Sequence, residues 1–142
     1  MINGWIHAAL QRLRNLACRR LALSACLLAL LPANLNAAID FDRMLGLAAS
    51  QYGNRAKQNI RDLRTLLGNL QTADELEKVK RINLFVNQRI RTFGNDIDIW
   101  GKSDYWATPL ESLGREAGDC EDFSIAKYLF LRELDVSNDK LR

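Results

Sequence analysis

The chain has 142 residues, with 20 Lys and Arg against 17 Asp and Glu, and a formal net charge of +3. This length fits one small domain. The basic excess comes from the N-terminal segment, because no acidic residue precedes Asp40. From Asp40 onward, 16 basic residues face 17 acidic ones, a net charge near −1. The composition therefore gives no support for nucleic acid binding.

The N-terminal segment has the pattern of a secretory signal peptide. A basic region is followed by an eleven-residue apolar run over 21–31, and by small residues near Ala37. The run is too short to cross a bilayer, which takes about 20 apolar residues, so an uncleaved anchor is the less favoured alternative. We expect residues 1–37 to be removed on export, and 38–142 to form the N-terminal portion of one soluble domain.

This interpretation leaves one cysteine in the exported chain. Cys18 and Cys26 lie in the predicted signal peptide, as does His7, the only histidine. The residues before Cys26 look like a lipoprotein processing box, but the apolar run continues past that cysteine, which argues against lipidation. Cys120 is then a lone thiol in an oxidising compartment, either free and reactive or bridged to another molecule.

The residues after Asp40 are mostly helical by pattern. Asp40 caps a predicted short helix over 41–50, and apolar residues at three- and four-residue steps predict a second over 54–70. A capping box over 72–75 predicts a third helix that ends at Gly94. Its expected apolar stripe consists of Leu76, Val79, Ile82, Val86, Ile90 and Phe93.

Residues 95–107 show no clear period and are expected to form a loop rich in aromatic residues. Trp100, Tyr105 and Trp106 fit two interpretations equally well, as plugs of the core or as walls of a substrate groove. Asp96 and Asp98 form an Asp-x-Asp pair that is a weak metal signal and more typical of solvated carboxylates.

A second capping box, Thr108 to Glu111 with Pro109 at the first helical position, predicts a short helix. A further helix then begins at Cys120. Its residues from Phe123 to Leu134 are apolar nearly all round, which predicts a central, buried helix. Asp135 occupies the position at a helix end where glycine is usual.

The residues around Cys120 allow several chemical roles. A thiol at a helix N-terminus faces unpaired amides and the positive end of the helix dipole, which favour the reactive thiolate. A free cysteine can also be a small buried hydrophobe. Asp119, Glu121 and Asp122 suit a helix start, with Asp119 as its N-cap, but their charges oppose ionisation of a neighbouring thiol. A bound Ca²⁺, which takes hard oxygen ligands, would remove that conflict.

Two longer stretches, "DYWATPLE" (104–111) and "GDCEDFSIAKY" (118–128), carry a resemblance. From about Phe41 to its end the chain resembles the bacterial transglutaminase-like cysteine peptidases of the LapG type. The resemblance implies a papain-like α+β fold, a periplasmic location and cleavage of a large surface adhesin near its N-terminus, which releases a biofilm. It also implies Cys120 as the nucleophile and Ca²⁺ bound by Asp119 and Glu121, with Asp122 a further candidate. A partner is implied as well, an inner-membrane receptor that responds to cyclic di-GMP.

The chain departs from the family pattern after the cysteine helix. There the family carries its catalytic histidine and aspartate on strands, whereas this sequence stops at Arg142. We therefore expect the mainly helical N-terminal part of the fold, C-terminally truncated, with Cys120 a weak nucleophile on its own. The expected function is a calcium-dependent periplasmic cysteine endopeptidase. Acyl transfer to an amine and a non-catalytic, calcium-dependent binding module remain alternatives.

Overall fold

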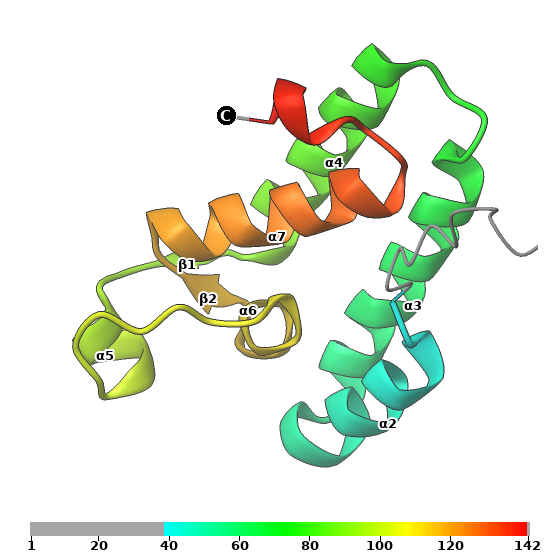
Figure 1. Cartoon of the computed structure of the whole chain (residues 1–142). Helices are drawn as coiled ribbons and strands as arrows, with labels where there is room; N and C mark the ends of the chain where they lie inside the picture. The colour runs from blue at the N-terminus through cyan, green and yellow to red at the C-terminus, as the bar shows by residue number, and fades with distance from the viewer. Residues whose placement is uncertain (1–38, 142) are drawn as a thin grey trace, which may run out of the picture. The chain divides into compact units, whose positions relative to one another are not determined.

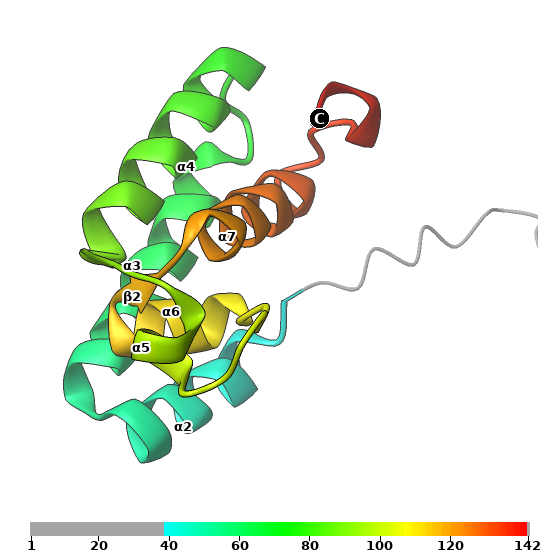
Figure 2. The same cartoon turned by 90° about the vertical axis from the view of Figure 1, so that its left-hand side faces the viewer.

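Helices make up most of residues 39–141, the part of the chain that the computed structural model describes (Figures 1 and 2). The predicted signal peptide lies outside these residues. The helices are α2 (Phe41–Tyr52), α3 (Asn54–Leu70), α4 (Glu75–Arg89), α5 (Asp96–Trp100), α6 (Pro109–Arg115), α7 (Cys120–Glu133) and a 3-10 turn, η1 (Asn138–Lys140). Two short strands, β1 (Thr92–Phe93) and β2 (Ala117–Gly118), complete the described elements.

Apolar burial holds the helices together. α2 packs on α3, α6 contacts both, and α7 lies along α4 (Figures 1 and 2). Gly53 separates α2 from α3 with φ +88° and ψ −170°, a conformation open only to glycine. The bounds predicted for α3 are confirmed, and so is most of its apolar face, since the buried residues on it are Ala56, Ile60, Leu63, Leu67 and Leu70.

The prediction for the third helix was wrong at both ends. Asp74 rather than Thr72 is the N-cap of α4, and its side chain accepts from the Glu77 N–H at 3.0 Å. The helix ends at Arg89, and Phe93 lies in β1 with 68% of its surface exposed. The inner face of α4 is also rotated relative to the predicted stripe, because Leu76 is 62% exposed while Phe85 is buried.

Pairing between β1 and β2 explains why α4 stops early. The strands are parallel, with Thr92 opposite Ala117 and Phe93 opposite Gly118. The Glu116 carbonyl accepts from the N–H groups of both Arg91 and Thr92, so these amides serve the sheet rather than a continued helix. This pairing places residues 91–94 beside the segment that leads into α7.

The prediction of a helix buried all round holds for only part of α7. Ala126, Phe130 and Leu131 are buried, but Tyr128 is 39% and Leu129 is 42% exposed. Just after the C-terminal end of α7, the expectation for Asp135 is confirmed: its φ is +60°, a left-handed value that glycine usually adopts at a helix end. No helix among residues 39–141 is both long enough and apolar enough to span a membrane.

Candidate active site

Cys120 is the first residue of α7 and lies at the molecular surface. Asp119 caps the helix as expected: its Oδ1 accepts from the backbone N–H groups of Glu121 at 3.1 Å and Asp122 at 3.3 Å. The Asp122 side chain accepts in return from the Asp119 N–H at 3.3 Å, which completes a capping box. The Cys120 N–H has no hydrogen-bond partner among residues 39–141, as is usual for the first amide of a helix. An exposed thiol thus lies beside a free amide donor.

Asp122 is the buried centre of this region, with no exposed surface. Its Oδ1 accepts from the Ala107 N–H at 2.8 Å, and its Oδ2 accepts from the Trp100 Nε1–H at 3.2 Å in addition to the Asp119 N–H. A carboxylate that is buried without such donors would be costly. The bonds from Trp100 and Ala107 fasten the end of α5 and the loop before α6 to the first turn of α7, and the bond from Asp119 closes the helix cap.

Gly118 allows this arrangement by its small size. A Cβ atom on Gly118 would approach the Asp122 Cβ to 2.9 Å and its Oδ2 to 3.0 Å, closer than folded proteins tolerate. The glycine before the cysteine is therefore required by the close approach of β2 to the Asp122 side chain.

Three carboxylates converge at this place: those of Asp96, Asp119 and Asp122 each have an oxygen within 4.8 Å of the others. Asp96 Oδ2 accepts from the Tyr105 N–H at 2.6 Å, but Asp96 Oδ1 is buried and has no hydrogen-bond partner among the described residues. A buried, unpartnered carboxylate oxygen facing two further carboxylates is a donor set that suits a hard cation such as Ca²⁺.

The ligand set predicted from the sequence differs in one member. Asp119 and Asp122 belong to the cluster, whereas Glu121 is exposed and lies outside it. Asp96, which the sequence indicated to be a solvated loop residue, is in the cluster because it begins α5 rather than a loop. The Asp-x-Asp pair was a weak signal for Asp96, but its meeting with Asp119, 23 positions away, depends on the fold and could not be read from the sequence.

The three aromatic residues are held in different ways. Trp100 and Tyr105 are half-buried with ring centroids 5.5 Å apart, and the Arg115 guanidinium lies 5.0 Å from the Trp100 ring centroid. Trp106, by contrast, is 65% exposed. Trp100 and Tyr105 therefore pack on each other at the site, and the Trp106 side chain is mostly exposed.

Comparison with known proteins supports the resemblance found in the sequence. Residues 49–142 match the family model described as bacterial transglutaminase-like cysteine proteinase BTLCP. The chain belongs to this family. Among solved structures it is similar to Legionella pneumophila LapG, with 28% sequence identity and a TM-score of 0.59 over 72% of this chain. No curated protein matches.

The predicted fold class is confirmed for this BTLCP family member: residues 39–141 form a mostly helical part of a transglutaminase-like fold, with a small parallel sheet. The match covers 55% of the LapG chain, so this sequence spans about half of that protein. All residues of the candidate site fall within the family match.

A further carboxylate, that of Glu111 on α6, is hydrogen-bonded to Tyr105 of the candidate site. Glu111 completes the capping box predicted at Thr108, and its Oε1 accepts from the Tyr105 hydroxyl at 2.7 Å. Burial raises the pKa of Glu111, but hydrogen bonds from Thr108 and Tyr105 outweigh it, and the net pKa lies below the ordinary value of 4.5. The same hydrogen bond, with burial and the Glu111 charge, raises the pKa of Tyr105 above 10.0. The two pKa shifts favour an ionised Glu111 and a protonated Tyr105 near neutral pH, the states in which the Tyr105 hydroxyl donates to the Glu111 carboxylate.

Proposed function

We propose that this chain provides the nucleophile-bearing part of a calcium-dependent, periplasmic cysteine endopeptidase that cleaves a large surface adhesin near its N-terminus. The observation that carries the proposal is the geometry of Cys120, an exposed thiol at the start of α7 with its own N–H unpaired. Membership of the BTLCP family supports a peptidase. The adhesin, the cyclic di-GMP receptor and the periplasmic location follow from the sequence resemblance.

The chemical roles follow from this geometry. The Cys120 thiolate attacks a peptide carbonyl, and the Cys120 N–H donates to the oxyanion that forms on the carbonyl oxygen. The resemblance assigns the histidine and aspartate that complete the site to strands after α7. Residues 39–141 contain no histidine, so they supply the nucleophile and the oxyanion donor but no imidazole base.

Calcium fits the carboxylate cluster beside the nucleophile. Asp96, Asp119 and Asp122 would hold the ion, and because Ca²⁺ takes about six to eight oxygen ligands, Glu121 remains a further candidate. When bound, Ca²⁺ would offset the negative charge of the carboxylates around the thiol. Trp106 is the aromatic residue best placed to contact the substrate, with Trp100 and Tyr105 packed behind it.

Calcium titration tests the cation site directly. We expect calorimetry of the purified chain to detect Ca²⁺ binding, and Asp96→Asn to weaken it at least about tenfold. Asp98→Asn is the matched control, because Asp98 is exposed in the same short helix and lies outside the cluster. Equal loss in the two variants, or no binding by the parent chain, would refute the site.

Incubation with an N-terminal adhesin fragment, with and without a calcium chelator, tests the activity. Cleavage that is lost in Cys120→Ser and in chelator would support the endopeptidase. A second candidate is a non-catalytic, calcium-dependent module that binds the adhesin or the receptor. Calcium-dependent binding without cleavage, unchanged in Cys120→Ser, would establish that candidate instead.

A further inference from the structure

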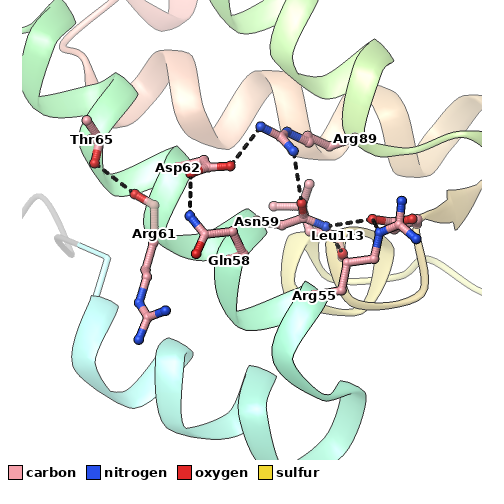
Figure 3. A network of polar contacts seen from close by, with 9 residues as sticks. Arg55, Gln58, Asn59, Arg61, Asp62, Thr65, Arg89 and Leu113 are labelled. Atoms are coloured by element: carbon pink, nitrogen blue, oxygen red, sulfur yellow. Dashed lines mark hydrogen bonds and ion pairs between the residues drawn. The ribbon is translucent and has the colours of Figure 1, made fainter.

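A polar network centred on a buried asparagine joins α3 to the turn that precedes the nucleophile (Figure 3). At its centre is Asn59, which is 1% exposed and donates from Nδ2 to the Leu113 carbonyl at 3.0 Å and to Glu116 Oε1 at 3.1 Å. Asn59 Oδ1 accepts from Arg89 Nη1 at 3.4 Å, and Arg89 Nη2 contacts Asp62 Oδ2 at 2.7 Å. The network thus connects α3, the end of α4 and the end of α6.

Glu116 is the member of this network that lies closest in sequence to Cys120. Its Oε1 also accepts from Arg55 Nε at 2.9 Å, and its side chain is only 16% exposed. Its carbonyl accepts from the Arg91 and Thr92 N–H groups at 2.8 and 3.0 Å. Four donors from α3 and from the junction of α4 with β1 therefore hold this single residue.

The backbone of Glu116 shows why so many contacts are needed. Glu116 has φ +54° and ψ +32°, a left-handed conformation that a non-glycine residue adopts at a cost of about 1 kcal/mol or more. This conformation turns the chain out of α6 and directly into β2. Such strain persists only where surrounding contacts over-determine it.

The strand itself is too short to fix the site. β2 has two residues, and the carbonyls of Glu116 and Gly118 provide its bonds to the 91–94 segment. Asp119 and Cys120 follow immediately. A displacement of the turn at Glu116 would be passed through two residues to the helix cap and the thiol.

We propose that Glu116 is a positioning residue, which fixes the start of α7 and the Cys120 thiol through its contacts with Asn59 and Arg55. The importance of that position for catalysis rests on the proposed function, whereas the positioning itself is a property of this chain. In the fixed arrangement the thiol remains at the start of α7, next to its own N–H, which is unpaired within the described part of the chain.

The reactivity of Cys120 toward iodoacetamide tests this role without requiring peptidase activity. Modification is measured in the full chain by mass spectrometry of the tryptic peptide 116–127, so that Cys18 and Cys26 do not contribute. Glu116→Gly keeps the left-handed turn accessible but removes the side-chain acceptor. We expect alkylation of the folded chain near pH 7 to slow at least about threefold, because the thiol is displaced from the amides of the first helical turn. Alkylation in denaturing urea at the same pH, where this arrangement is lost in both proteins, should be equal.

Two further variants separate positioning from stability. Glu116→Gln retains an acceptor for Asn59 and should restore most of the rate near pH 7. Asp135→Gly changes a residue with a similar φ of +60° at the other end of α7 and should leave the rate unaltered. Thermal midpoints of all variants, measured in parallel, ensure that the rates are compared well below unfolding.

The result that would overturn the proposal is a folded Glu116→Gly variant with an alkylation rate near pH 7 equal to that of the parent chain. An equal slowing in Asp135→Gly would also overturn it, because relief of backbone strain would then suffice. Should Glu116→Gly fail to fold, Asn59→Ala carries the same comparison: slower alkylation near pH 7 supports the proposal, and an unchanged rate refutes it. These alkylation measurements do not depend on peptidase activity, so they can be interpreted even if the chain does not cleave the adhesin.

Discussion

The helical frame (α2, α3 and α4) and the site segment (residues 95–122) are stabilised by different forces. The frame buries apolar side chains at helical spacing, and its ion pairs are exposed, as between Arg64 and Asp42, or half-buried, as between Arg89 and Asp62. In the site segment, carboxylates accept hydrogen bonds from backbone N–H groups of distant residues, as Asp122 does from Ala107. Apolar burial has no preferred direction, whereas each of these hydrogen bonds specifies an atom and an angle. Apolar burial in the frame therefore provides stability, and the directional hydrogen bonds, including those from Asn59 and Arg55 of α3 to Glu116, provide position.

A core truncation in the frame should have the largest effect on stability. Leu63 is fully buried in α3, so Leu63→Ala should lower the free energy of unfolding by about 3–4 kcal/mol through lost burial and a residual cavity. Urea denaturation measures this. The rate of Cys120 alkylation, measured where both proteins are folded, should stay near that of the parent chain.

Leu84→Ala serves as the control for that truncation. Leu84 is 51% exposed on α4, so its truncation should cost about 1 kcal/mol or less. Similar losses at Leu63 and Leu84 would contradict the placement of the core, and a large change in Cys120 reactivity in Leu63→Ala would contradict the separation of the two regions.

Substitution of the buried Asp122 in the site segment should change the reactivity of Cys120 and cost less stability than Leu63→Ala. Asp122→Asn keeps the shape but puts an NH₂ donor where an oxygen accepted, opposite either the Ala107 N–H or the Trp100 and Asp119 donors. We expect a loss of about 2 kcal/mol in the free energy of unfolding. We also expect a changed tryptophan emission and a changed rate of Cys120 alkylation.

The exposed Asp98→Asn is the control for this change, with a cost within about 0.5 kcal/mol. If Asp122→Asn altered neither the fluorescence nor the thiol reactivity, Asp122 would not be the residue that fastens the aromatic segment to α7.

The contrast between the regions also explains what the sequence could predict. Periodicity located α3 to the residue, because every third or fourth position there is buried. Capping chemistry located Asp119 and Thr108, since a cap and its partner are three residues apart. Both signals are local.

One error was local, since Asp74 rather than Thr72 caps α4. The other errors arose where residues distant in sequence meet in the fold. The Glu116 carbonyl takes the amides of Arg91 and Thr92, which ends α4 early and starts β1. Asp96 meets Asp119 only in the folded chain, so its place in the carboxylate cluster was not predictable from spacing. The identity of Cys120 as the candidate nucleophile was accessible from local sequence, and the network behind it was not.

The smallest expected effect concerns the hydrogen bond between Tyr105 and Glu111, which joins the loop before α6 to that helix within the site segment. The lowered pKa of Glu111 means that its carboxylate stabilises the fold at pH values above 4.5, and that this contribution is lost as the pH falls through the folded-state pKa. The raised pKa of Tyr105 has the opposite consequence: its contribution is complete below pH 10.0 and is lost as the pH rises through the folded-state pKa.

Glu111→Gln should therefore be less stable than the parent chain between these limits, and the gap in urea midpoints should close below about pH 4. Glu77→Gln, at an exposed position on α4 where the carboxylate lies 3.7 Å from Arg81, should show a smaller gap throughout. A Glu111→Gln gap that is as wide at pH 3 as at pH 7 would mean that side-chain shape, rather than the charged acceptor, joins the loop before α6 to that helix.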